Sequence, residues 1–377
     1  MTVTGAIRRL PLIAMAALAL LAGVWAGLIR LGWTLPPIQP AWIAEHGPLM
    51  VSGFLGTLVS LERAMALAAV ARSRLPYLAP LLTALGGGVL LVGLPDVFGR
   101  GLIALGSLAL VDIFLAINRR QPNWAHATMG AGALLWLAGN LLWLMGRPIY
   151  QAVPWWLAFL VLTIAGERLE LARVTPHLPV GAGVVLRRLS LVSFLACLAL
   201  VAAGLVLSLV SMPAGIRLSG LGLFALGAWL LRFDLARRTV RQSGLTRFIA
   251  LCLLPGYAWL AFAGLAWMIW ADRFSAGPWY DAMLHAITLG FIFSMIFGHA
   301  PLILPAVTGR PLPYGPYFYS HVILLHAALL LRVIGDLALQ SNLRQWGGML
   351  NGVAILLFLG NSLWAVRHAP RAKAAEG

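Results

Sequence analysis

The sequence has 377 residues, of which 61% are hydrophobic and 10% are charged. A soluble globular domain carries about 45–50% apolar and about 25% charged residues, so the composition excludes both a soluble globular protein and a low-complexity disordered chain. The formal net charge of +16 would suggest nucleic-acid binding in a soluble protein. In a chain this apolar we expect the basic residues to flank membrane spans instead, and we predict no nucleic-acid partner.

Apolar stretches long enough to span a bilayer, about 20 residues each, follow one another along the whole chain. Turn residues separate them, as at Leu94-Pro95-Asp96 and Gln121-Pro122-Asn123. The stretches cover residues 10–31, 43–70, 76–94, 101–118, 125–145, 152–171, 187–211, 215–232, 247–270, 282–305, 316–339 and 346–366. The predicted fold is therefore an all-α polytopic membrane protein of about twelve transmembrane helices, forming a single transmembrane domain over residues 1–377 in a lipid bilayer.

The basic residues predict the orientation of these helices. With a cytoplasmic N-terminus, 20 of the 27 lysines and arginines fall on the cytoplasmic side, as the positive-inside rule requires. Both termini are therefore expected in the cytoplasm. The first apolar run follows Arg8 and Arg9 but is longer than the apolar region of a signal peptide, so we interpret it as a retained helix.

A weak internal repeat and the two cysteines do not indicate a catalytic or metal-binding site. The second and sixth predicted helices end in Glu62-Arg63 and Glu167-Arg168, which is consistent with three groups of four helices. Each Glu-Arg pair is typical of an ion pair near the membrane interface. Cys197 and Cys252 lie inside apolar runs, which excludes a disulfide framework and a cysteine-based zinc site.

Histidines inside predicted spans are the first candidates for function, because ionisable residues in a membrane are rare and costly. Five of the eight histidines lie there: His46, His285, His299, His321 and His326. His46 and His285 are expected at the same outer depth, on helices that run in the same direction. Two imidazoles at one depth could be the axial ligands of a haem, or each could simply bond a neighbouring helix.

The spacing within the tenth predicted helix extends this hypothesis to the inner half. His285 and His299 are 14 residues apart, which in an α-helix is about 21 Å and about 40° from alignment. His299 and His321 are expected at a shared depth, with His326 five residues further on. We therefore consider His299, His321 and His326 as ligands of a second haem or a copper ion. Small residues after His46 and His285 would either leave room for a macrocycle or serve helix packing.

Several stretches resemble one family, the NnrS-type haem- and copper-containing membrane proteins. The run at 284–290 reads LHAITLG and is followed by Met295 and by TGRPL at 308–312, while residues 256–260 read GYAWL. In the second helix His46, Met50, Gly53 and Phe54 match the family's pattern. The family has histidine, glutamate and histidine where this sequence has Pro48, Leu49 and Val307. Any role of those polar side chains is therefore lost here. Histidines on helices 2 and 10 of twelve also resemble the catalytic subunit of haem-copper oxidases.

The resemblance implies a haem-binding redox protein of the bacterial inner (cytoplasmic) membrane, linked to nitric oxide or nitrosative stress by electron transfer. His46 and His285 would bind a haem b, and a quinol or a cytochrome would be the electron partner. The alternatives are a proton-coupled permease for a small molecule, with the broken tenth helix lining its path, and an assembly or stress-tolerance factor without turnover. Haem absorption separates the first hypothesis from the other two.

Overall fold

The computed structural model describes residues 9–174, 182–308 and 312–368. Within these ranges the chain is helical and has no strand, and 12 helical segments are long and apolar enough to cross a membrane. The predicted all-α polytopic membrane fold is therefore confirmed. The orientation of the termini, which lie outside the described residues, stays a prediction.

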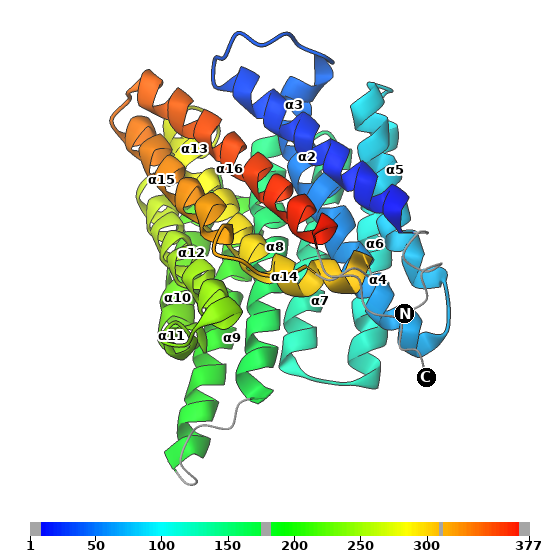
Figure 1. The fold of residues 1–377 in the computed structure, drawn as a ribbon, viewed down its shortest axis with the longest axis vertical. Helices are drawn as coiled ribbons and strands as arrows, with labels where there is room; N and C mark the ends of the chain where they lie inside the picture. The colour runs from blue at the N-terminus through cyan, green and yellow to red at the C-terminus, as the bar shows by residue number, and fades with distance from the viewer. Residues whose placement is uncertain (1–8, 175–181, 309–311, 369–377) are drawn as a thin grey trace.

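Most spans are single α-helices joined by short turns (Figure 1). These are α2 (Leu10–Arg30), α5 (Leu78–Val92), α6 (Asp96–Arg120), α7 (Trp124–Leu144), α8 (Ile149–Val174), α9 (Ala182–Ser208), α10 (Met212–Phe233), α12 (Gly244–Ile269), α15 (Phe318–Leu337) and α16 (Ser341–Arg367). Short elements join some of them: η2 (Leu75–Tyr77), α11 (Ala236–Thr239) and η3 (Ala271–Arg273).

Two spans have a different backbone. The second consists of α3 (Ala41–Pro48), the π-helix η1 (Leu49–Gly56) and α4 (Thr57–Ala71). The tenth repeats this pattern with α13 (Pro278–His285), the π-helix η4 (Ala286–Phe293) and α14 (Ser294–Thr308). Long π-helical segments are rare and occur often at functional sites. Here each follows directly on the turn that carries a candidate ligand, His46 or His285.

The helix ends follow from local chemistry. The side chain of Asn123 caps α7 by accepting a hydrogen bond from the His126 backbone N–H at 2.7 Å. Gly93 ends α5 in the left-handed conformation, with φ of +74°. Asn123 belongs to a turn expected from the sequence, and Gly93 directly precedes the expected turn at Leu94-Pro95-Asp96. His126 lies within the span Trp124–Leu144, so six histidines, not five, are in spanning segments.

The helix α8 lies at the centre of the bundle. Its most apolar 18-residue window is 78% buried, more than that of any other described span. Phe159 of α8 stacks on Trp136 of α7 with 4.7 Å between ring centroids, and Trp156 is fully buried. Because α8 is covered by other helices, its residues can form a wall of the cavity that residues of the two π-interrupted spans also line.

Charged side chains pair between helices at the end of the bundle opposite His46 and His285. Arg63 forms an ion pair with Glu167, and Arg168 binds Asp234 through two hydrogen bonds of 2.8 and 2.9 Å. From the sequence, each Glu-Arg pair is expected to be an ion pair near the membrane interface. In the structure these residues connect α4, α8 and the end of α10, because arginines in membranes find carboxylates on other helices.

Candidate functional site

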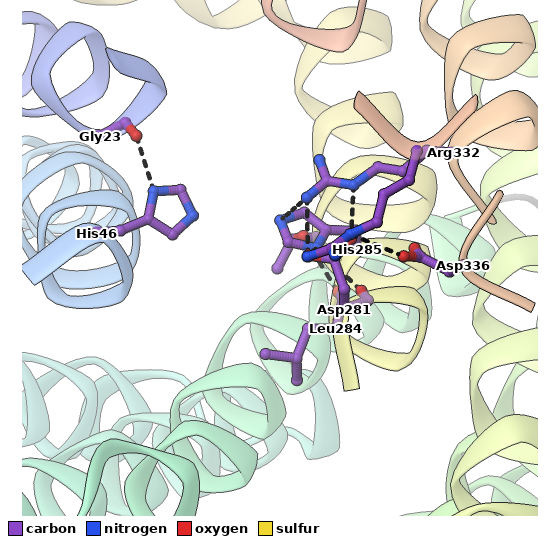
Figure 2. Close-up of polar contacts among 9 residues, drawn as sticks. Gly23, His46, Asp281, Leu284, His285, Arg332 and Asp336 are labelled. Carbon is purple, nitrogen blue, oxygen red and sulfur yellow. Dashed lines mark hydrogen bonds and ion pairs between the residues drawn. The ribbon is translucent and has the colours of Figure 1, made fainter. Parts of the chain in front are cut away.

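His46 and His285 lie beside one another across the bundle, as their shared depth predicted. Their ring centroids are 6.4 Å apart and the ring planes differ by 30°. Below them, Phe54 and Phe293 stack with 6.1 Å between centroids, so the two spans touch there and leave the histidines facing each other. Figure 2 shows the two imidazoles on opposite sides of a gap, with Nε2 of His46 directed away from Gly23.

Hydrogen bonds define the tautomer of each ring. Nδ1 of His46 is 2.7 Å from the carbonyl oxygen of Gly23, and Nδ1 of His285 is 2.9 Å from that of Asp281. A carbonyl can only accept, so each Nδ1 carries the proton and donates it. The lone pair of each ring is therefore on Nε2, which is the arrangement of a metal-ligating histidine.

A cavity of about 650 Å³ contains both rings, within the range of about 300–1,000 Å³ that is usual for ligand and cofactor sites. Its walls are mostly apolar and come from α2, η1, α8, η4 and α16, including Val24, Val51, Val153, Leu157, Phe293 and Ile355. Such a cavity suits a largely apolar molecule.

Three arginines line the same cavity: Arg30, Arg332 and Arg344. Arg30 donates to the carbonyl oxygen of Ile43 at 3.0 Å and lies at the end of α2, so the cationic side of the cavity is near the end of the bundle. Arg332 binds Asp281 with two hydrogen bonds of 2.7 and 2.8 Å (Figure 2). The cavity thus combines apolar walls with positive charge at one edge.

Most of the small residues that follow His46 and His285 allow close helix packing and do not provide space in the cavity. A Cβ on Gly53 would lie 3.0 Å from Ala19 Cβ and 3.7 Å from Gly87 Cα, and one on Gly290 would lie 2.5 Å from Trp259. Room beside the ligand comes from Gly27 of α2, where a Cβ would lie 2.9 Å from Cε1 of His46.

The three histidines predicted for a second metal site do not share one set of partners. His299 donates from Nδ1 to the carbonyl oxygen of Met295 at 2.8 Å, so its Nε2 lone pair is free. Trp259 Nε1–H donates to Nδ1 of His326 at 3.2 Å, and Nε2–H of His326 lies 3.2 Å from Ser294 Oγ. Both nitrogens of His326 are therefore used in hydrogen bonds.

His321 lies among aromatic rings. Its centroid is 4.8 Å from that of Phe297 and 5.3 Å from that of Phe358, and both pairs are close to perpendicular. Asn361 Nδ2 lies 3.1 Å from Nδ1 of His321, which assigns the proton to Nε2. Its contact with Phe297 agrees with the expected shared depth of His321 and His299.

Among the residues that the structure describes, no three His, Cys, Asp or Glu side chains form a group that could hold a metal ion. Neither His321 nor His326 offers a free lone pair in the bonding described above. A metal site at His299, His321 and His326 thus stays a prediction from the sequence, without a supporting arrangement.

The π-helix also alters the predicted relation of His285 to His299. A π-helical turn has about 4.4 residues instead of 3.6, so the eight residues of η4 rotate the following helix by roughly 0.4 of a turn. The 40° offset expected between His285 and His299 assumed an uninterrupted α-helix, and the structure has a π-helix between them.

Sequence reasoning missed several residues of the site. Asp281, Arg332, Asp336 and Arg344 form two acid–base pairs beside His285. A signal was present for Asp281, an acidic residue four positions before a candidate ligand and thus on the same helix face. The carbonyl of Gly23 could not be predicted as an acceptor, because every residue has a main-chain carbonyl whatever its side chain.

A family model described as a domain of unknown function, DUF8744, matches residues 9–367. The chain belongs to the DUF8744 family. The DUF8744 match covers both π-interrupted spans and all residues of the cavity. A comparison with curated proteins finds no match, and the resemblance to NnrS-type proteins stays a prediction.

Proposed function

We propose that this protein binds a haem b between His46 and His285 and transfers electrons within the membrane. The observation that carries the proposal is the pair of Nε2 lone pairs facing one cavity at the same depth. The 6.4 Å between the two ring centroids would leave room for a metal ion held by both Nε2 atoms.

The cavity fits the rest of the group. Apolar walls suit the macrocycle, and Arg30 and Arg344 on one side suit its carboxylate substituents. One contact runs against the fit, since Nη2 of Arg332 lies 3.4 Å from Nε2 of His285. That distance is near the limit of a hydrogen bond, so ligation would replace a weak interaction.

The ligand set favours one kind of chemistry. A haem held by His46 and His285 would supply one-electron transfer. The chain's own residues would hold both rings in a fixed tautomer and exclude water from the apolar side. Following the resemblance to NnrS-type proteins, we link this electron transfer to nitric oxide or nitrosative stress in the bacterial inner membrane, with a quinol or a cytochrome as electron partner. A second haem or copper is not part of the proposal.

Haem reconstitution of the purified protein tests the proposal. The wild type is expected to give a Soret band and the spectrum of a low-spin haem, and His46→Ala and His285→Ala are expected to lose it. His368→Ala is the matched control, because Nδ1 of His368 lies 2.8 Å from the carbonyl oxygen of Trp364, four residues earlier, as in His285, but His368 lies outside the candidate spans. No Soret band in the wild type would overturn the proposal.

A second candidate function is a permease for a small organic anion. Three arginines and two histidines in one cavity would also attract a carboxylate, and π-helical or broken spans line the paths of many transporters. Proteoliposomes with the haem-free protein would be tested for uptake of labelled carboxylates. Uptake that is lost in Arg30→Gln would favour this function over haem binding.

A further inference from the structure

The two candidate axial ligands differ in what surrounds their Nδ1 atoms. His46 donates to the carbonyl oxygen of Gly23 on α2. Nδ1 of His285 donates to the carbonyl oxygen of Asp281 at 2.9 Å and also lies 3.2 Å from the carboxylate Oδ1 of the same residue. One ligand thus bonds a neutral group, while the other also contacts an anionic one.

The carboxylate of Asp281 is held in place from another helix. Arg332 of α15 binds its two oxygens with Nε and Nη2, at 2.7 and 2.8 Å, and this two-pronged geometry fixes the plane of the carboxylate. A Cβ on Gly347 of α16 would lie 2.5 Å from the backbone nitrogen of Arg332. Since α16 passes so close, the base of the arginine cannot shift easily.

A second acid–base pair stands behind the first. Asp336, one turn after Arg332, is fully buried, and its Oδ1 is 3.1 Å from Nε of Arg344 (Figure 2). Asp336 therefore has its ion pair with Arg344 and not with a histidine. It provides a natural comparison for Asp281.

A carboxylate that accepts the Nδ1–H bond makes an imidazole a stronger electron donor through Nε2. Stronger donation stabilises the more highly charged, oxidised metal and lowers the reduction potential. Resting on the proposed haem site, we infer that Asp281 is a positioning residue that sets the ligand strength of His285, and that Arg332 fixes the carboxylate for this role. His46 lacks the carboxylate contact, so the two sides of the site are electronically unequal.

Redox titration of the reconstituted protein tests this inference. Asp281→Asn is expected to shift the ratio of reduced to oxidised haem at least tenfold toward the reduced form at a fixed potential, a rise of about 59 mV for one electron. The g values of the ferric low-spin haem are expected to change with it. Asp336→Asn removes a carboxylate whose ion pair is with Arg344 and not with His285, and it is expected to shift the ratio less than about threefold.

Asp281→Glu separates the hydrogen bond from the charge. It keeps the charge but moves the carboxylate by one methylene, so a positioned hydrogen bond predicts a shift in the same direction as Asn. A field effect alone predicts the wild-type ratio. Asp281→Glu also decides the matter if Asp281→Asn does not fold.

Two outcomes overturn the inference alone while haem stays bound: equal shifts for Asp281→Asn and Asp336→Asn, or a wild-type ratio for Asp281→Glu. A wild type without haem overturns the proposed function and this inference together. The two failures are therefore distinguishable by the Soret band measured before the titration.

Discussion

Gly27 offers a direct test of the cavity geometry, because it contacts the face of one candidate ligand. In Gly27→Ala the new Cβ would lie 2.9 Å from Cε1 and 3.2 Å from Nδ1 of His46, closer than an ordinary contact of about 3.5–4.0 Å. The ring cannot simply yield, since its Nδ1 is held by the Gly23 carbonyl at 2.7 Å. It has to tilt, and its Nε2 then points away from His285.

Forcing an extra methyl group into a packed site costs about 1–3 kcal/mol, which corresponds to roughly a 5- to 150-fold loss of affinity. Titration of the haem-free protein with haem, followed at the Soret band, measures this ratio. Gly101→Ala is the control, because a Cβ at Gly101 meets nothing within 4 Å and adds only the higher helix propensity of alanine. Equal haem affinity in Gly27→Ala and the control would refute the reasoning.

Three further predictions concern stability and the second set of histidines. Asp234→Asn is expected to destabilise the protein by about 3–5 kcal/mol, because Arg168 is left buried without its anion. The double variant that combines Arg168→Met with Asp234→Leu is expected to recover most of this loss. Melting temperatures in detergent measure both variants, and equal melting temperatures for the single and the double variant would contradict the mechanism. Gly87→Ala brings a Cβ within 3.0 Å of Gly53 Cα and is expected to lower the stability by about 1–3 kcal/mol. Alanine at Gly101, where a Cβ meets nothing within 4 Å, is not expected to have this cost. An unchanged melting temperature in Gly87→Ala would disprove the contact. His326→Phe is expected to lower stability without changing haem or copper content by elemental analysis, and a loss of metal would restore His326 as a ligand.

The spans and the depth of the two principal histidines could be predicted, and for a physical reason. In a bilayer the apolar run fixes where a helix begins and ends, so a residue's position along the run fixes its depth. That rule is enough to place His46 beside His285, and it also gives the shared depth of His321 and His299.

The bonding of each imidazole could not be predicted in this way. His326 and His299 look alike in the sequence, but a tryptophan and a serine on neighbouring helices use both nitrogens of His326. The π-helix η4 is similarly hidden, because no residue type in Ala286–Phe293 requires a wider turn. The partner of Arg168, Asp234, depends on which helices become neighbours, and periodicity along one helix carries no such information.

The histidines and arginines of the cavity come from the two ends of the chain. His46 and its acceptor Gly23 belong to the first two spans, whereas His285, Arg332 and Arg344 belong to the last three. Because a membrane protein is inserted from its N-terminus onward, the first wall is in the bilayer long before the second is synthesised. If the site binds a haem as proposed, loading would be a late event in biogenesis, because a chain halted before the tenth span has His46 but lacks His285.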